Sequence, residues 1–310
     1  MTRVTAPIVL FVYNRPDHVK KVIESLKKNE LSSESKLFIY SDYPKNADAQ
    51  DAVNKVRKFI KSISGFEKIE IIERETNYGL KRNILEGVSE VIEKYNKAIV
   101  MEDDIEPSQY FLDYMNDALD KYEDEDLVME VSATHEYMDV EGLPESFFIK
   151  KGFCHGWATW KRAWDRYDKN LSPKEIIGMF DRHMRKSFNL NGATFEFGEV
   201  IDNYVGEINT WAVFWDIAIY LNDGLVLVPR ENMACNIGFD GSGEHCPKVG
   251  RAINSLAEER LIFYPDDVSE NRFAKERYVD GCLKRRPDLL HRVYYSLLMS
   301  CKLYFGNRKE

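Results

Sequence analysis

Three consecutive carboxylates end an apolar run in the first third of the chain. The run is Ala98 to Met101, and the acids are Glu102, Asp103 and Asp104. Adjacent carboxylates repel one another, so a chain that only had to fold would rarely place three of them at the end of a core strand. Mn²⁺ or Mg²⁺ removes this repulsion, because both ions prefer oxygen ligands and share them with substrate phosphates. The alternative is a solvated acidic turn that caps the next helix.

The elements that must position these acids alternate between strand and helix periods over the first 135 residues. Apolar runs predict buried strands, and apolar residues at helical spacing predict the helices between them. The predicted strands are Ile8 to Tyr13, Lys36 to Tyr40, Ile69 to Ile72, Ala98 to Met101 and Leu127 to Val131. The predicted helices are Pro16 to Leu26, Ala47 to Ile63, Leu80 to Tyr95 and Phe111 to Tyr122.

This alternation predicts an α/β fold with a mostly parallel, doubly wound sheet, whose ligands bind at the carboxyl ends of the strands. Polar residues stand at those ends, with Arg15 after the first strand, Asp42 after the second and the three acids after the fourth. A dinucleotide-binding fold would carry G-x-G-x-x-G after its first strand. That position is Tyr13-Asn14-Arg15-Pro16-Asp17, without glycine, which argues against an ordinary NAD or FAD enzyme.

Four stretches of the first half, in order, resemble the GT-A glycosyltransferases, and among them the inverting N-acetylglucosaminyltransferase I type. They are Phe11 to Pro16, Tyr40-Ser41-Asp42, Asn77 to Asn83 and Val100 to Asp104. The resemblance implies a UDP-sugar donor and Mn²⁺ (or Mg²⁺) held by Asp104. The implied donor contacts are Arg15, Asp42 on the uracil, Arg82, Asn83, Glu102 and Asp103. Asn83 stands where that family carries a donor-contacting His, which leaves the donor sugar open.

Two stretches of the second half extend the resemblance, which spans about residues 6 to 250. Gly156-Trp157 is similar to the family's segment beside the sugar, and Phe214-Trp215-Asp216 to the segment that carries its catalytic base. Attack by an acceptor hydroxyl requires a positioned base, so Asp216 is the expected base of a single, inverting displacement. The alternatives are that Asp216 caps a helix or pairs with a cation such as Arg230. Trp157 and Trp215 are either a platform for the sugar ring or core residues.

The stretch from Asn236 to Gly250 holds four glycines and predicts a mobile loop. Its part from Asn236 to Cys246 stands where the family has a loop that closes on the donor. His245 within it is the expected diphosphate contact. A zinc site that joins Cys154-His155 to His245-Cys246 is a weaker alternative, because the spacing matches no standard zinc motif.

Composition narrows the class of protein. A net charge of −9 argues against a nucleic-acid-binding surface, and the five scattered cysteines favour a reducing, cytoplasmic setting. Residues 284–310 carry seven basic and two acidic side chains, a local net of +5, so the remainder carries −14. Apolar residues at helical spacing in this tail predict either a peripheral contact with the inner face of a membrane or a helix packed on the domain.

The expected organisation is a nucleotide-sugar-binding half (1–135), an acceptor and catalytic half of the same domain (136–283) and the basic tail (284–310). The expected activity is metal-dependent, inverting transfer of a hexose, with N-acetylglucosamine the first candidate, from a UDP-sugar to a hydroxyl of a glycan or lipid-linked saccharide. The rival classes are a sugar-nucleotide hydrolase or nucleotidyltransferase and a non-catalytic carbohydrate-binding module. No motif identifies the acceptor.

Overall fold

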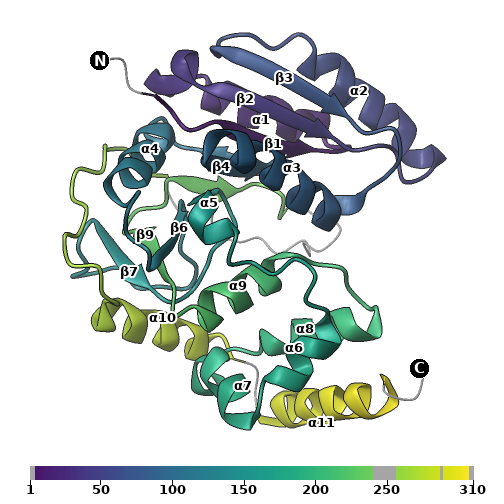
Figure 1. Cartoon of the computed structure of the whole chain (residues 1–310), viewed down its shortest axis with the longest axis vertical. Coiled ribbons are helices and arrows are strands. Elements are labelled where there is room, and N and C mark those ends of the chain that lie inside the picture. Colours follow the sequence, from purple (N-terminus) through teal and green to yellow (C-terminus); the bar gives the residue numbers. More distant parts are fainter. Residues whose placement is uncertain (1–3, 240–255, 287–288, 307–310) are drawn as a thin grey trace.

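A central sheet of eight strands runs through the computed structural model, which describes residues 4–239, 256–286 and 289–306 (Figure 1). The strand order is β3-β2-β1-β4-β8-β6-β9-β7, and only β8 and β7 run against the other six. The strands are β1 Ile8–Val12, β2 Lys36–Ser41, β3 Lys68–Glu73, β4 Lys97–Glu102, β6 Val128–Ser132, β7 Ser146–Ile149, β8 Trp157–Trp160 and β9 Leu225–Pro229. A two-stranded sheet pairs β5 Ile105–Pro107 with β10 Ala234–Asn236.

Helices cover both faces of the sheet, as the doubly wound prediction requires. They are α1 Pro16–Leu26, α2 Gln50–Ile60, α3 Gly79–Tyr95, α4 Phe111–Lys121, α5 Lys161–Trp164, α6 Pro173–Met179, α7 Arg182–Phe188, α8 Phe197–Val205, α9 Ala212–Leu221, α10 Arg272–Lys284 and α11 Leu289–Gly306. Helices α1, α2 and α4 contribute to the core on one face, and α3, α5, α8 and α9 to the core on the other.

Strand β1 explains why both faces are covered. Successive side chains of a strand point to opposite faces. Ile8 and Leu10 accordingly lie in the core with α1, whereas Val9 and Phe11 lie in the core with α3. All five residues of β1 are buried. The predicted fold class and the predicted strands and helices of the first 135 residues are confirmed, with ends that differ by a few residues.

The second half of the chain completes the same sheet. Strand β8 lies between β4 and β6 and runs antiparallel to both, so residues from beyond position 136 pair directly with the predicted nucleotide-binding half. The boundaries at 135 and 283 stay predictions. Among the described residues, no helix has the length and apolar character needed to cross a bilayer.

Candidate active site

The carboxyl ends of β1, β2 and β4 meet at one edge of the sheet. Phe11 of β1 is the register partner of both Tyr40 in β2 and Glu102 in β4. The chain segments that follow these three strands therefore start side by side. This places Arg15, Asp42 and the three consecutive acids at the same edge, as the sequence predicted.

Arg15 lies against the two aspartates at the end of β4. Its guanidinium forms an ion pair with Asp103, and its Nη1 donates to Oδ2 of Asp104 at 3.0 Å. Asp103 also accepts a hydrogen bond from the backbone N–H of Tyr13 at 3.1 Å. Burial works to lower the pKa of Arg15, but the charges of Asp103 and Asp104 outweigh it and raise that pKa. One fixed cation thus faces two of the three carboxylates.

The carboxylate cluster holds more negative charge than Arg15 neutralises. Burial, and then the charge of Asp104, raise the pKa of Glu102 to about 8. Burial also raises the pKa of Asp103, although Arg15 opposes the change. An added cation would relieve this repulsion, and the donor set consists of carboxylate oxygens, which suits Mn²⁺ or Mg²⁺. Among the described residues, no three His, Cys, Asp or Glu side chains are placed so that they could hold one metal ion together. An ion held by one or two carboxylate oxygens here would take its remaining ligands from phosphates.

The chain beyond β10 passes over Asp104. Because β10 pairs with β5, the backbone N–H of Ile237 donates to the Asp104 carbonyl at 2.8 Å. A Cβ at Gly238 would lie 2.3 Å from Oδ2 of Asp104 and 3.0 Å from Nη1 of Arg15. Only glycine permits this close approach. Residues 240–250 of the predicted loop, including His245, lie outside the described residues.

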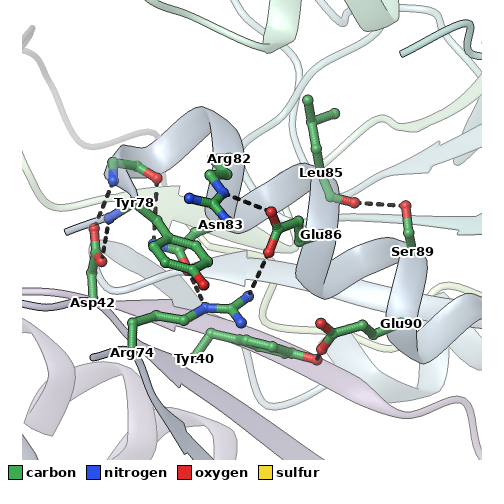
Figure 2. Close-up of polar contacts among 11 residues, drawn as sticks. Tyr40, Asp42, Arg74, Tyr78, Arg82, Asn83, Leu85, Glu86, Ser89 and Glu90 are labelled. Atoms are coloured by element: carbon green, nitrogen blue, oxygen red, sulfur yellow. Dashed lines mark hydrogen bonds and ion pairs between the residues drawn. The ribbon is translucent and has the colours of Figure 1, made fainter. Parts of the chain in front are cut away.

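Asp42 organises the loop between β3 and α3. Its Oδ1 accepts from the backbone N–H groups of Tyr43 and Tyr78, and its Oδ2 from the N–H of Gly79 and the side chain of Asn77, at 2.8 to 3.1 Å. Figure 2 shows Asp42 beside Tyr78. A carboxylate has about four acceptor positions, so all are filled. The predicted bond to uracil N3–H would have to replace one of these four. Asp42 therefore supports the loop between β3 and α3.

The two remaining predicted donor contacts differ in exposure. Figure 2 shows the Tyr78 ring between two guanidinium groups, with Arg82 at 3.6 Å and Arg74 at 4.5 Å from its centroid. Arg82 is exposed and donates to Glu86 at 2.6 Å. Asn83 is buried, and its amide oxygen accepts from Nε of Arg74 at 3.0 Å. In this conformation the amide of Asn83 holds Arg74, so the contact between Asn83 and the donor stays a prediction that would require this amide to change partners.

Helix α9 carries Asp216, and an ion pair fixes this side chain. Asp216 pairs with Lys151, and its Oδ1 accepts from the backbone N–H of Gly152 at 3.0 Å. The cation is Lys151 rather than Arg230, which donates to the Leu143 carbonyl instead. Nζ of Lys151 also lies 3.4 Å from Glu196. Asp216 thus has a fixed orientation in a largely buried charged cluster.

The tryptophans belong to the core. Trp157 and Trp215 are 1 and 0% exposed, and their ring centroids lie 5.9 Å apart in a cluster with Trp164 and Trp211. Nε1 of Trp215 donates to the buried carboxyl of Glu130 at 2.6 Å. The predicted sugar platform is wrong, because neither ring has a face that a sugar could reach. The alternative, that both are core residues, is confirmed.

A short segment joins the Asp216 cluster to the acids of β4. Lys151 and Gly152 contact Asp216. His155 lies close enough to Glu102 and Asp104 for their negative charges to raise its pKa. Four residue steps span at most about 14 Å, so the two groups of charges belong to one region. Burial works to lower the pKa of His155, but the hydrogen bond to Glu136 and the charges of Glu136, Glu102 and Asp104 together outweigh burial and raise this pKa.

Several residues of this region were missed by the sequence prediction. Besides Lys151 and His155 they include Lys81, whose Nζ lies 4.2 Å from the ring centroid of Phe214 and so connects α3 with α9. Burial lowers the pKa of Lys81. The sequence contained one indication of a role for Lys81, because this residue lies within Asn77 to Asn83, the stretch that resembles a donor-contacting segment. Nothing in the sequence linked Lys151 to Asp216, because their contact spans 65 positions.

Comparisons with known proteins identify the class. The model of glycosyl transferase family 2 matches residues 8–183, more than half of the 310 residues. The chain belongs to glycosyl transferase family 2, and its sheet, with the acids at the carboxyl end of β4, is of the GT-A type.

Matches to individual proteins are more distant. Among solved structures, the mannosyltransferase PcManGT from Pyrobaculum calidifontis, in complex with GDP-Man and Mn²⁺, matches with a TM-score of 0.40 and 9% identity over 71% of this chain and 70% of its own. TarS from S. aureus matches with a TM-score of 0.30 and 15% identity over 41% of this chain and 21% of its own. No curated protein matches.

Proposed function

We propose that this glycosyltransferase is metal-dependent and inverting, and that it transfers a hexose from a UDP-sugar to a hydroxyl of a glycan or lipid-linked saccharide. N-acetylglucosamine is the first candidate, from the resemblance to the N-acetylglucosaminyltransferase I type. The observation that carries the proposal is the group of three acids at the end of β4 with Arg15 against two of them. The family membership supports transfer over hydrolysis, nucleotidyl transfer or simple binding.

The charged residues would act in two places: one group on the donor diphosphate and the other on the acceptor hydroxyl. Asp104 would hold Mn²⁺ or Mg²⁺, with Glu102 and Asp103 toward the sugar or ribose. A bound ion would act as a Lewis acid on the diphosphate. Arg15 lies beside Asp104 and would hold the diphosphate, because a guanidinium fork matches phosphate oxygens. Arg82 is exposed at the same edge of the sheet and would provide a second guanidinium.

Asp216 would accept the proton of the attacking hydroxyl. Lys151 and the N–H of Gly152 fix the direction of its carboxylate, as a general base requires. Each of its oxygens has one described donor, so acceptor positions stay open for a hydroxyl. Direct attack with one base passes through no covalent sugar intermediate and inverts the anomeric centre.

Asp104→Asn is the first test. We expect it to abolish Mn²⁺-stimulated release of UDP from UDP-sugars in the presence of acceptor, while the thermal midpoint stays near that of the wild type. Asp124→Asn is the matched control, because Asp124 is exposed after α4. Wild-type turnover by Asp104→Asn at limiting Mn²⁺ would refute the metal assignment. Release of UMP or phosphate instead of UDP would refute sugar transfer.

Asp216→Asn tests the base and the stereochemistry. We expect kcat to fall by roughly 10²- to 10⁴-fold, the usual contribution of a positioned base, with little change in UDP affinity. NMR of the anomeric proton should show a β-linked product from an α-linked donor. An α-linked product would overturn both the base assignment and the inverting mechanism.

A further inference from the structure

Helix α11 exposes a row of apolar side chains on the side that faces away from the protein. Leu290, Tyr294 and Leu297 are 82, 65 and 62% exposed, and Cys301 and Tyr304 continue the row. Spacings of three and four residues place these side chains along one face of the helix. Single exposed apolar residues are common on protein surfaces, but a contiguous apolar patch marks a surface that another body covers. We refer to Leu290, Tyr294 and Leu297 as the outer row.

The opposite face holds α11 in place. Met299 is buried, and the Tyr295 ring lies 5.6 Å from that of Phe195. Nζ of Lys302 donates to the carboxylates of Asp202 in α8 and Glu207 just beyond it. These contacts fix the rotation of the helix about its axis. The outer row is therefore held outward.

The sequence that carries the outer row is positively charged, whereas the remainder of the chain is negative. No acidic residue occurs between positions 289 and 306, and Lys284 and Arg285, which precede α11, are exposed. Residues 284–310 carry a net +5 and the remainder −14. An anionic surface would attract this end of the molecule and repel the rest. Figure 1 shows α11 along the edge of the molecule opposite to α2 and β3, so the attraction would also orient the protein.

We propose that α11 docks on an anionic lipid bilayer, with the outer row among the head groups and Lys284 and Arg285 against lipid phosphates. Leucine supplies apolar area to such an interface, and tyrosine places a ring there with its hydroxyl in water. A second copy of the chain fits less well, because pairing two α11 helices would bring together like charges without a carboxylate in either helix. The docking goes beyond sugar transfer and does not depend on it.

Vesicle sedimentation with the full chain tests the proposal. The vesicles are phosphatidylcholine alone and phosphatidylcholine mixed with phosphatidylglycerol. We expect binding to the mixed vesicles only, weakened by added salt because the attraction is electrostatic. Leu290→Gln with Leu297→Gln should lower the partition coefficient by at least about tenfold. Leu127→Gln, at an exposed leucine outside α11, is the matched control and should bind as the wild type does.

Each other outcome overturns the proposal. Equal binding to both kinds of vesicle would remove the role of charge, and equal binding by the double variant would remove the role of α11. Size-exclusion chromatography with light scattering identifies the rival occupant. A dimer that the double variant converts to a monomer, without vesicle binding by the wild type, would assign the row to a second copy. Thermal midpoints near that of the wild type establish that the variants are folded.

Discussion

The acids at the end of β4 and the cation against them are the residues whose roles follow most directly from chemistry. Their sequence positions predicted a common edge, because parallel strands place their carboxyl ends together. Asp42 and Asn83 also lie at this edge, yet their side chains bond to the protein itself. A single sequence reports that a polar side chain stands at a strand end. It does not report whether that side chain faces the ligand or supports the loop beneath it.

The buried carboxyl of Glu130 should make the stability of the protein depend on pH. It is fully buried, and its oxygens accept from the N–H of Phe153 at 2.9 Å and from Nε1 of Trp215 at 2.6 Å. Burial raises the pKa of Glu130 to about 8 from its usual 4.5, although both N–H groups work to lower it. The folded protein then keeps a proton that the unfolded chain releases. This contribution to stability is present below about pH 4.5 and is lost as the pH rises to about 8.

Glu130→Gln removes this titration. We expect the stability of the wild type relative to the variant to decrease with pH across that window, with a slope of up to about 1.4 kcal/mol per pH unit. Urea unfolding at several pH values measures it. Glu123→Gln, at an exposed glutamate after α4, is the control and should leave the slope unchanged. A difference between wild type and Glu130→Gln that stays constant over this range would contradict the prediction.

Elements of the first half could be predicted because each one is specified locally, by an apolar run or by helical spacing. Strand β8 could not be placed in this way. Its sequence, Trp157 to Trp160, became part of the sheet through pairing with β4 and β6. Trp157 became a core residue through contact with α9, and Trp160 through contact with α4 on the opposite face. Such long-range contacts leave no periodic pattern. The same limit kept the pair of Lys151 and Asp216 out of the predicted site.

The short connection after β10 provides a prediction at the scale of an element. Gly238→Ala would place a methyl group 2.3 Å from Oδ2 of Asp104, whose movement Arg15 restricts. We expect the carboxylate to shift and Mn²⁺ affinity, measured by calorimetry in the presence of UDP, to fall by about tenfold or more. Gly178→Ala in α6 is the control, because a Cβ there meets nothing within 4 Å. Unchanged Mn²⁺ affinity in Gly238→Ala would separate this segment from the metal site.

The whole molecule brings together groups that lie far apart in the chain. Arg15, Asp104 and Gly238 meet at one point, and each comes from a different segment. Binding of a ligand at that point should therefore stabilise the folded state as a whole rather than one element. A ligand that binds only the folded state adds about 2.7 kcal/mol to its stability when present at a hundred times its Kd. The thermal midpoint of the full chain is thus a direct measure of nucleotide preference.

We expect UDP with Mn²⁺ to raise the thermal midpoint by several degrees and GDP with Mn²⁺ to raise it less, because the proposed donor is a UDP-sugar. About 2.7 kcal/mol corresponds to roughly 4 °C in a protein of 310 residues. Asp104→Asn should lose the part of the shift that requires Mn²⁺, and Asp124→Asn should keep it. Asp42→Asn should lower the midpoint even without nucleotide, since its carboxylate holds three backbone N–H groups and Asn77. A shift with GDP that equals or exceeds the shift with UDP would reject the uridine assignment and leave the metal assignment standing.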